Sequence, residues 1–191
     1  MTETVAAIVA AHRAGTVSPA QTVARSFARI RAHNDPAIFI SLRDEKEAIA
    51  EAQALSAKDP AQLPLFGVPV GVKDNIDIKG LPTTAACPAF SYVPSHDATA
   101  VARLRAAGAI VVGKTNLDQF ATGLVGVRSP YGIPKNPLRG DLIPGGSSSG
   151  SGVAVSVPSE SGTNPTETAT ADPELDPPGM RSDRIGLVGM P

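Results

Sequence analysis

Hydrophobic residues near the start of the chain recur at helical spacing in two separate segments. Residues 5–12 place apolar side chains three and four positions apart before Gly15, which predicts an amphipathic helix that ends at a glycine cap. The run 18–21 then supplies a serine N-cap, a proline at the first helical position and a capping-box glutamine. A second helix is therefore predicted to extend to about His33.

Short apolar runs follow, separated by a segment of helix-forming residues. Residues 38–42 and 68–72 predict strands, the second of which ends at Lys73. Between them, residues 44–57 are rich in Glu, Ala and Lys, which is typical of a helix.

A further helix and strand are predicted in the middle of the chain. Asp97 is expected to cap a helix that stops at Gly108, and the β-branched run 109–112 predicts the next strand. Strands that alternate with helices indicate an α/β domain with a largely parallel sheet. With 191 residues, of which 42% are hydrophobic, the chain can build a core.

The composition changes after Val157. Residues 158–183 are rich in proline and acidic residues, and we expect them to be a disordered tail because they cannot bury enough apolar surface. A short apolar run returns at residues 184–191 and is expected to be a remnant strand. We therefore predict one folded unit over residues 1–157.

The charge and the cysteine content indicate which partners the protein is expected to bind and in which cellular compartment it is expected to occur. A net charge of -1 without any basic block argues against nucleic acid and acidic membrane surfaces as partners. The single cysteine, Cys87, excludes an internal disulfide framework and suits a reducing compartment. The apolar runs are too short for a bilayer span, so we expect a soluble cytoplasmic protein.

Metal and thiol chemistry are not expected. His12, His33 and His96 lack metal-ligand spacing with a carboxylate or with the cysteine. Cys87 has no evident histidine partner, which favours a buried or structural thiol over a nucleophile. We predict that the protein uses no metal and no cofactor.

The strongest chemical signal is Lys73 together with the loop PGGSSSGSG at residues 144–152. A lysine acts as a base only where burial or neighbours lower its pKa, and a buried strand offers that setting. Lysine beside serine is a known arrangement for activating a hydroxyl. Taken alone, a loop of this composition is typical of a linker, and a lysine at a strand end usually reaches water.

A second motif points to different chemistry. Residues 108–115 read GAIVVGKT and satisfy the phosphate-binding pattern GxxxxGK[ST]. A helix precedes this run, and its four middle residues favour a strand rather than a flexible loop. A nucleotide-binding module is therefore a weaker alternative.

The segments GVPVGVKDNID and PGGSSSGSG, in this order, resemble the amidase signature family, over residues 2–157 of this chain. The resemblance implies a mixed sheet with helices on both faces, here truncated to about the first third of the domain. It also implies a Ser-Ser-Lys triad, in which Lys73 is the base and Ser147 is a serine that follows a cis peptide bond. Four loop residues support them: Gly145, Gly146, Ser148 and Ser149.

The same resemblance places other segments around this pair. Asp74 and Asn75 are expected to lie behind the lysine, and Ser151 is expected to donate a supporting hydrogen bond. Residues 114–132 are expected to form a loop beside the active site.

Three stretches, at residues 35–45, 81–132 and 144–152, resemble the branch of the family that hydrolyses allophanate. The resemblance implies hydrolysis of this small amide to ammonia and carbon dioxide in urea degradation. The amidotransferase subunit that acts on glutamyl-tRNA is the second choice within the family.

The family's nucleophilic serine is expected about two dozen residues past Ser147, in a segment like GTDTAGSGR. This chain instead reads SGTNPTETATADPELDPPG, where no nucleophile is identifiable and Thr168 is a weak candidate. We therefore expect an inactive, truncated form. The alternative is a non-catalytic pseudoenzyme or a regulatory fragment, which is expected to form homo-oligomers or to associate with an intact amidase because its sheet edge is uncovered.

Overall fold

The structure is a computed structural model that describes residues 4–157. Three strands form one sheet, in the order β1-β3-β2. They are β1 (Phe39–Leu42), β2 (Pro69–Lys73) and β3 (Ile110–Thr115). β3 pairs parallel with β2 and antiparallel with β1. The largely parallel sheet predicted from alternation is therefore wrong for β1, because alternation does not fix the direction of an edge strand, and the mixed sheet implied by the family resemblance is confirmed.

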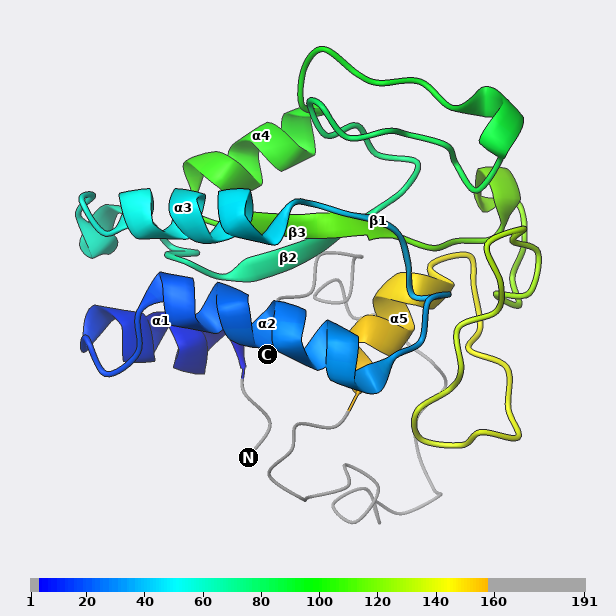
Figure 1. Cartoon of the computed structure of the whole chain (residues 1–191), viewed down its shortest axis with the longest axis horizontal. Coiled ribbons are helices and arrows are strands. Elements are labelled where there is room, and N and C mark those ends of the chain that lie inside the picture. Colours follow the sequence, from blue (N-terminus) through cyan, green and yellow to red (C-terminus); the bar gives the residue numbers. More distant parts are fainter. Residues whose placement is uncertain (1–3, 158–191) are drawn as a thin grey trace, which may run out of the picture.

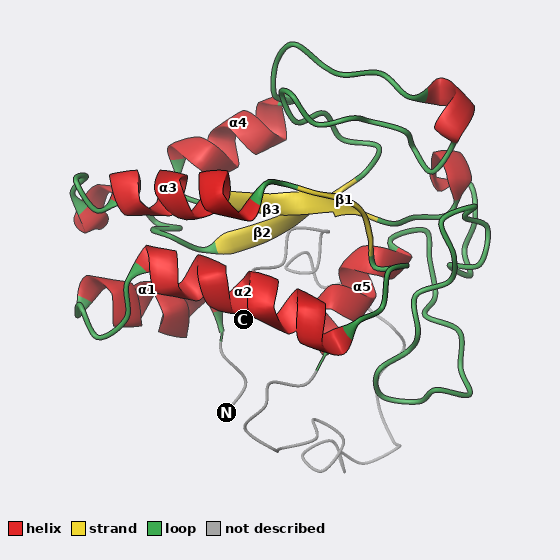
Figure 2. Ribbon diagram, in the orientation of Figure 1, coloured by secondary structure: helices red, strands yellow, loops and turns green. Residues whose placement is uncertain are grey.

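Helices enclose this sheet (Figures 1 and 2). The first three predicted helices are confirmed, and the described residues contain five longer helices: α1 (Val5–Arg13), α2 (Pro19–His33), α3 (Glu45–Leu55), α4 (Thr99–Ala106) and α5 (Ser149–Ser156). The capping box of α2 forms as predicted, since Ser18 and Gln21 exchange hydrogen bonds. Every helix within residues 4–157 is too short or too polar to cross a bilayer.

β3 divides the core into two layers. Its Ile110 and Val112 pack with residues of α2, α3 and α5, whereas Val111 packs with residues of α1 and α4. Successive side chains of a strand point to opposite faces, so helices cover both faces of the sheet. The central strand is therefore fully buried and supplies rigid positions on either side.

The predicted cap of α4 is wrong. The N-cap position of this helix is Ala98, with no side-chain hydrogen bond. Asp97 instead accepts the backbone N–H of Lys79 at 2.8 Å and pairs with Arg105 at 3.2 Å. Asp97 lies two residues before the first residue of α4, and the Arg105 guanidinium and the Lys79 backbone N–H bind its carboxylate instead.

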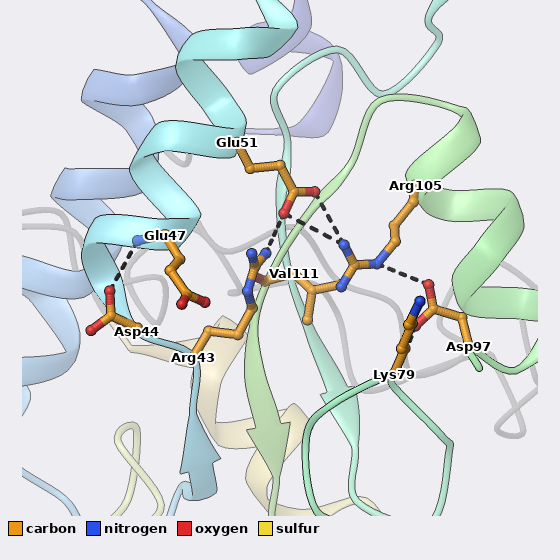
Figure 3. Close-up of polar contacts among 8 residues, drawn as sticks. All are labelled: Arg43, Asp44, Glu47, Glu51, Lys79, Asp97, Arg105 and Val111. Atoms are coloured by element: carbon orange, nitrogen blue, oxygen red, sulfur yellow. Dashed lines mark hydrogen bonds and ion pairs between the residues drawn. The ribbon is translucent and has the colours of Figure 1, made fainter. Parts of the chain in front are cut away.

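Asp97 belongs to a charged group that we name the edge network: Arg43, Glu51, Arg105 and Asp97 (Figure 3). Glu51 of α3 accepts from Arg43 at 2.5 Å and from Arg105 of α4 at 3.2 Å. Arg43 also donates to the carbonyl of Val111 in β3 at 3.2 Å. The network joins two helices and the central strand to the loop that follows Lys73.

The division predicted after Val157 is a prediction that the structure does not test. The expected tail at residues 158–183, the expected strand at residues 184–191 and the nucleophile candidate Thr168 all lie outside the described residues.

Candidate active site

The structure brings together the lysine and serine that the sequence singled out. Lys73 ends β2, and its Nζ donates to Ser147 Oγ at 2.6 Å and to Ser148 Oγ at 3.0 Å. The peptide bond between Gly146 and Ser147 is cis, as the resemblance implies. Residues more than seventy positions apart thus form one hydrogen-bonded group.

Burial lowers the pKa of the Lys73 ammonium, because the charged form loses solvation. The negative charge of Asp118 acts in the opposite direction, but the net change is downward. This agrees with the environment expected from the buried strand. More of the neutral amine is available near neutral pH, and a neutral amine can accept a proton from the hydroxyl it contacts.

The two loop glycines allow this close approach. Gly145 has a φ of +78°, in the left-handed region that favours glycine. A Cβ on Gly146 would lie 2.5 Å from Asp118 Oδ2 and 2.6 Å from the backbone nitrogen of Gly126. Only glycine therefore allows the serine loop to pack against the segment that follows β3.

The remaining loop serines differ in what they contact. Ser148 accepts from Lys73, and Ser151 shares a 2.7 Å hydrogen bond with Thr115 of β3. Ser149 is buried, and its Oγ has no partner among the described residues. Within this part of the chain, Ser148 and Ser151 therefore have hydrogen-bond partners and Ser149 Oγ has none, so a supporting role for Ser149 stays a prediction.

Asp118 is a member of the site that the sequence patterns did not single out. Its carboxylate accepts three backbone N–H groups, from Arg128 at 2.8 Å, Gly126 at 2.9 Å and Val125 at 3.2 Å. Burial raises the pKa of Asp118, but these hydrogen bonds and the charge of Arg128 outweigh it and hold the pKa below its usual value. The Asp118 N–H also donates to the Ser147 carbonyl at 3.0 Å, which anchors the serine loop.

Asn116 was missed as well. Its buried side-chain amide donates to the carbonyls of Ala37 at 2.8 Å and Gly132 at 3.1 Å, and its oxygen accepts from Ser129 Oγ at 2.6 Å. The resemblance did imply that this loop lies beside the active site. The signal that could have named the residues is an asparagine and an aspartate within three positions of the end of a predicted buried strand, since buried polar groups there must be hydrogen-bonded.

The two residues after Lys73 have different surroundings. Asp74 is fully buried, and its Oδ2 accepts the backbone N–H of Thr84 at 3.0 Å. Asn75 is exposed, so its expected place behind the lysine stays a prediction. Cys87 is a free and partly buried thiol.

The residues that match the nucleotide-binding motif do not form a phosphate-binding loop in this structure. Helix α4 precedes it, residues 110–115 form β3, and the side chain of Lys114 is fully buried. A phosphate-binding loop needs exposed backbone N–H groups between its glycines, which a central strand does not provide.

Comparison with known proteins identifies relatives that match most of this chain. The Amidase family profile matches residues 21–167. The chain is 59% identical over 125 residues to urea amidolyase of Lachancea kluyveri, and 44% identical over 145 residues to a subunit of the glutamyl-tRNA(Gln) amidotransferase of Exiguobacterium sibiricum. These matches cover 65% and 75% of this chain. The structure superposes on allophanate hydrolase of Kluyveromyces lactis with a TM-score of 0.70 and 44% identity, over 80% of this chain.

The chain spans only part of each of these proteins. It covers 7% of the urea amidolyase, 25% of the allophanate hydrolase chain and 30% of the amidotransferase subunit.

Proposed function

Because the chain belongs to the amidase family, we propose that it carries the lysine and serine of an amidohydrolase site whose substrate is allophanate. The observation that carries the proposal is the 2.6 Å contact between Lys73 Nζ and Ser147 Oγ, with the pKa of Lys73 lowered by burial. Under this proposal residues 1–157 form the first part of an amidase domain. The hydrolysis itself uses no metal and no cofactor.

The proposed chemistry is proton transfer followed by acyl transfer. Neutral Lys73 accepts a proton from Ser147, which in turn accepts one from a nucleophilic serine. That serine attacks the amide carbonyl, ammonia leaves with the proton returned by the same relay, and water hydrolyses the acyl-enzyme. Asp118 stabilises the lysine after it has become an ammonium.

The substrate proposal rests on similarity between sequences. Identity to urea amidolyase is 59%, compared with 44% for the amidotransferase subunit, which favours a small free amide over glutamyl-tRNA. A role in urea degradation, in solution in the cytoplasm, follows as part of the same proposal.

We further propose that the 191-residue chain alone does not hydrolyse allophanate. After Val157 its sequence lacks a Gly-Ser-Gly segment that could present backbone N–H groups to an oxyanion, and Thr168 is not flanked by one. Loss of a serine nucleophile typically lowers the rate by about 10⁶-fold. The alternative is a non-catalytic fragment that associates with an intact amidase.

Ammonia release from allophanate tests both proposals. The chain is assayed beside a repaired protein, in which residues 158–191 are replaced by the matching remainder of a urea amidolyase amidase domain. We expect activity only in the repaired protein, and a loss of about 10³-fold or more when it carries Lys73→Met or Ser147→Ala. Activity in neither protein would refute allophanate as the substrate, and activity in both would refute the inactivity of the chain.

A further inference from the structure

Lys114 is a buried lysine that the proposed chemistry does not use. It lies in β3 with 0% of its side chain exposed. Its Nζ is 3.1 Å from Asp74 Oδ1, and it donates to Thr83 Oγ1 at 2.9 Å and to the Pro82 carbonyl at 3.2 Å. Buried lysines are rare unless they are paired, so this position needs a physical reason.

Asp74, the partner of Lys114, directly follows the proposed base. Both side chains of the pair are fully buried. In the parallel pairing of β2 with β3, Val72 lies opposite Lys114, and Lys73 lies opposite Thr115. Because side chains alternate along a strand, Lys73 and Lys114 point to opposite faces of the sheet, and Asp74 is on the face of Lys114.

We propose that Lys114 is a positioning residue for Lys73: by pairing with Asp74 it neutralises a buried carboxylate that would otherwise hold the adjacent Lys73 as an ammonium. This inference rests on the proposed role of Lys73 as a base. It assigns a purpose to a lysine that the sequence alone associates with a phosphate-binding loop.

The charges around Lys73 support this assignment. α5 contributes hydroxyl groups and no charged residue. The other titratable or charged groups near the two lysines are Asp118 with Arg128 in the loop after β3, and Asp77 with Tyr92 in the segment after β2. Asp118 already stabilises the ammonium form of Lys73, so a second uncompensated carboxylate would add to this effect. In general, at an effective dielectric constant of about 20, a unit charge changes the pKa of a group about 8 Å away by about 1.5, and that of a group about 12 Å away by about 1.

The test measures the titration of Lys73 itself, in the full 191-residue chain. Acetic anhydride reacts only with the neutral amine, so the acetylation rate of Lys73, followed by mass spectrometry as a function of pH, reports its pKa. We expect Lys114→Gln to raise this pKa by about one unit, because the carboxamide keeps a hydrogen-bond donor but not the charge. The double variant Asp74→Asn/Lys114→Gln removes both charges and is expected to restore the pKa of the unchanged chain.

Controls separate this effect from a general loss of structure. Lys46→Gln removes an exposed lysine on α3 and should leave the pKa of Lys73 unchanged. Circular dichroism establishes that each variant is folded. If Lys114→Gln does not fold, Asp74→Asn decides, because removing the carboxylate should leave the pKa of Lys73 equal or lower.

Two different failures are distinguishable. An unchanged pKa in folded Lys114→Gln, or an increase in Asp74→Asn, would overturn the role of Lys114. An ordinary lysine pKa for Lys73 in the unchanged chain would instead refute its proposed role as the base.

Discussion

Different contacts determine the protonation of Asp118 and of Lys73. Backbone hydrogen bonds keep Asp118 a carboxylate, and burial favours the neutral amine of Lys73. The Asp118 carboxylate is stabilised by three backbone N–H groups and does not depend on a cation from Lys73. Lys73 can therefore lose its proton without leaving a buried anion unpaired. An aspartate that relied on the ammonium for its stability would instead keep the lysine protonated.

Replacing Asp118 is expected to change the pH dependence of stability. Because the folded pKa of Asp118 is lowered, the carboxylate stabilises the fold above about pH 4, and this contribution is lost as the pH falls through the folded pKa. Asp118→Asn should lower the free energy of unfolding by about 1–3 kcal/mol at pH 7, because one amide group would face backbone donors. Urea unfolding at pH 7 and pH 3 measures this. A difference between the two proteins that stays constant with pH would contradict the assignment.

Gly146 is expected to tolerate no side chain. Gly146→Ala places a methyl group 2.5 Å from Asp118 Oδ2, so the serine loop must move away from Lys73. We expect a loss of about 1–3 kcal/mol in unfolding free energy and of at least about 10²-fold in the activity of the repaired amidase. Gly152→Ala is the matched control, since no residue of the described chain lies within 4 Å of a Cβ at that position in α5, and it should be neutral or stabilising. Equal effects of the two substitutions would contradict this account.

At the scale of secondary structure elements, features that depend on neighbouring residues were predicted correctly, and features that depend on residues distant in sequence were not. The start of α2 follows from Ser18, Pro19 and Gln21, which act within one helical turn, so the local sequence contains all the information needed for it. The direction of β1 depends on its pairing with β3, about seventy positions later, and no local pattern encodes it. The failure of Asp97 as a cap has a similar origin, because its carboxylate accepts the backbone N–H of Lys79, which lies in a different segment, eighteen positions earlier.

The edge network makes a prediction at this scale. Glu51 forms ion pairs with Arg43 and with Arg105 (Figure 3). Glu51→Gln therefore removes the negative charge that the two arginines share. We expect a loss of about 1–3 kcal/mol, measured by thermal unfolding. Glu45→Gln removes a more exposed ion pair with Arg31 and should cost less than about 0.5 kcal/mol. A smaller loss of stability in Glu51→Gln than in Glu45→Gln would contradict this prediction.

At the scale of the whole molecule, the site was predictable in part. Lys73 and the serine loop are distinctive segments, and their contact follows from the family resemblance. Asp118 and Asn116 were missed because their importance comes from burial, which arises only when distant segments close over them. Lys114 was misleading for the same reason, since the motif GxxxxGK[ST] does not show that its lysine points into a core.

Large apolar side chains remain exposed near the serine loop, and they predict self-association. Leu124 is 84% exposed and Ile143 is 54% exposed, while the Leu124 carbonyl accepts from the Gly146 N–H. We expect the chain to sediment as more than a monomer at micromolar concentration, and Leu124→Ser/Ile143→Ser to shift it towards the monomer. Val93→Ser, at a 63% exposed position on another loop, is the control. A monomeric unchanged chain would contradict the prediction.

The buried strand β3 also sets which changes of length the protein can accept. Its neighbouring residues Lys114 and Thr115 serve opposite faces, one paired with Asp74 and the other with Ser151. Inserting or deleting one residue in this strand would exchange the two faces, so that the ammonium would meet the serine loop and the hydroxyl would meet the carboxylate. A change of length is therefore expected to be tolerated better in the exposed segment around Arg139 than within β3, where two partners at once fix the spacing.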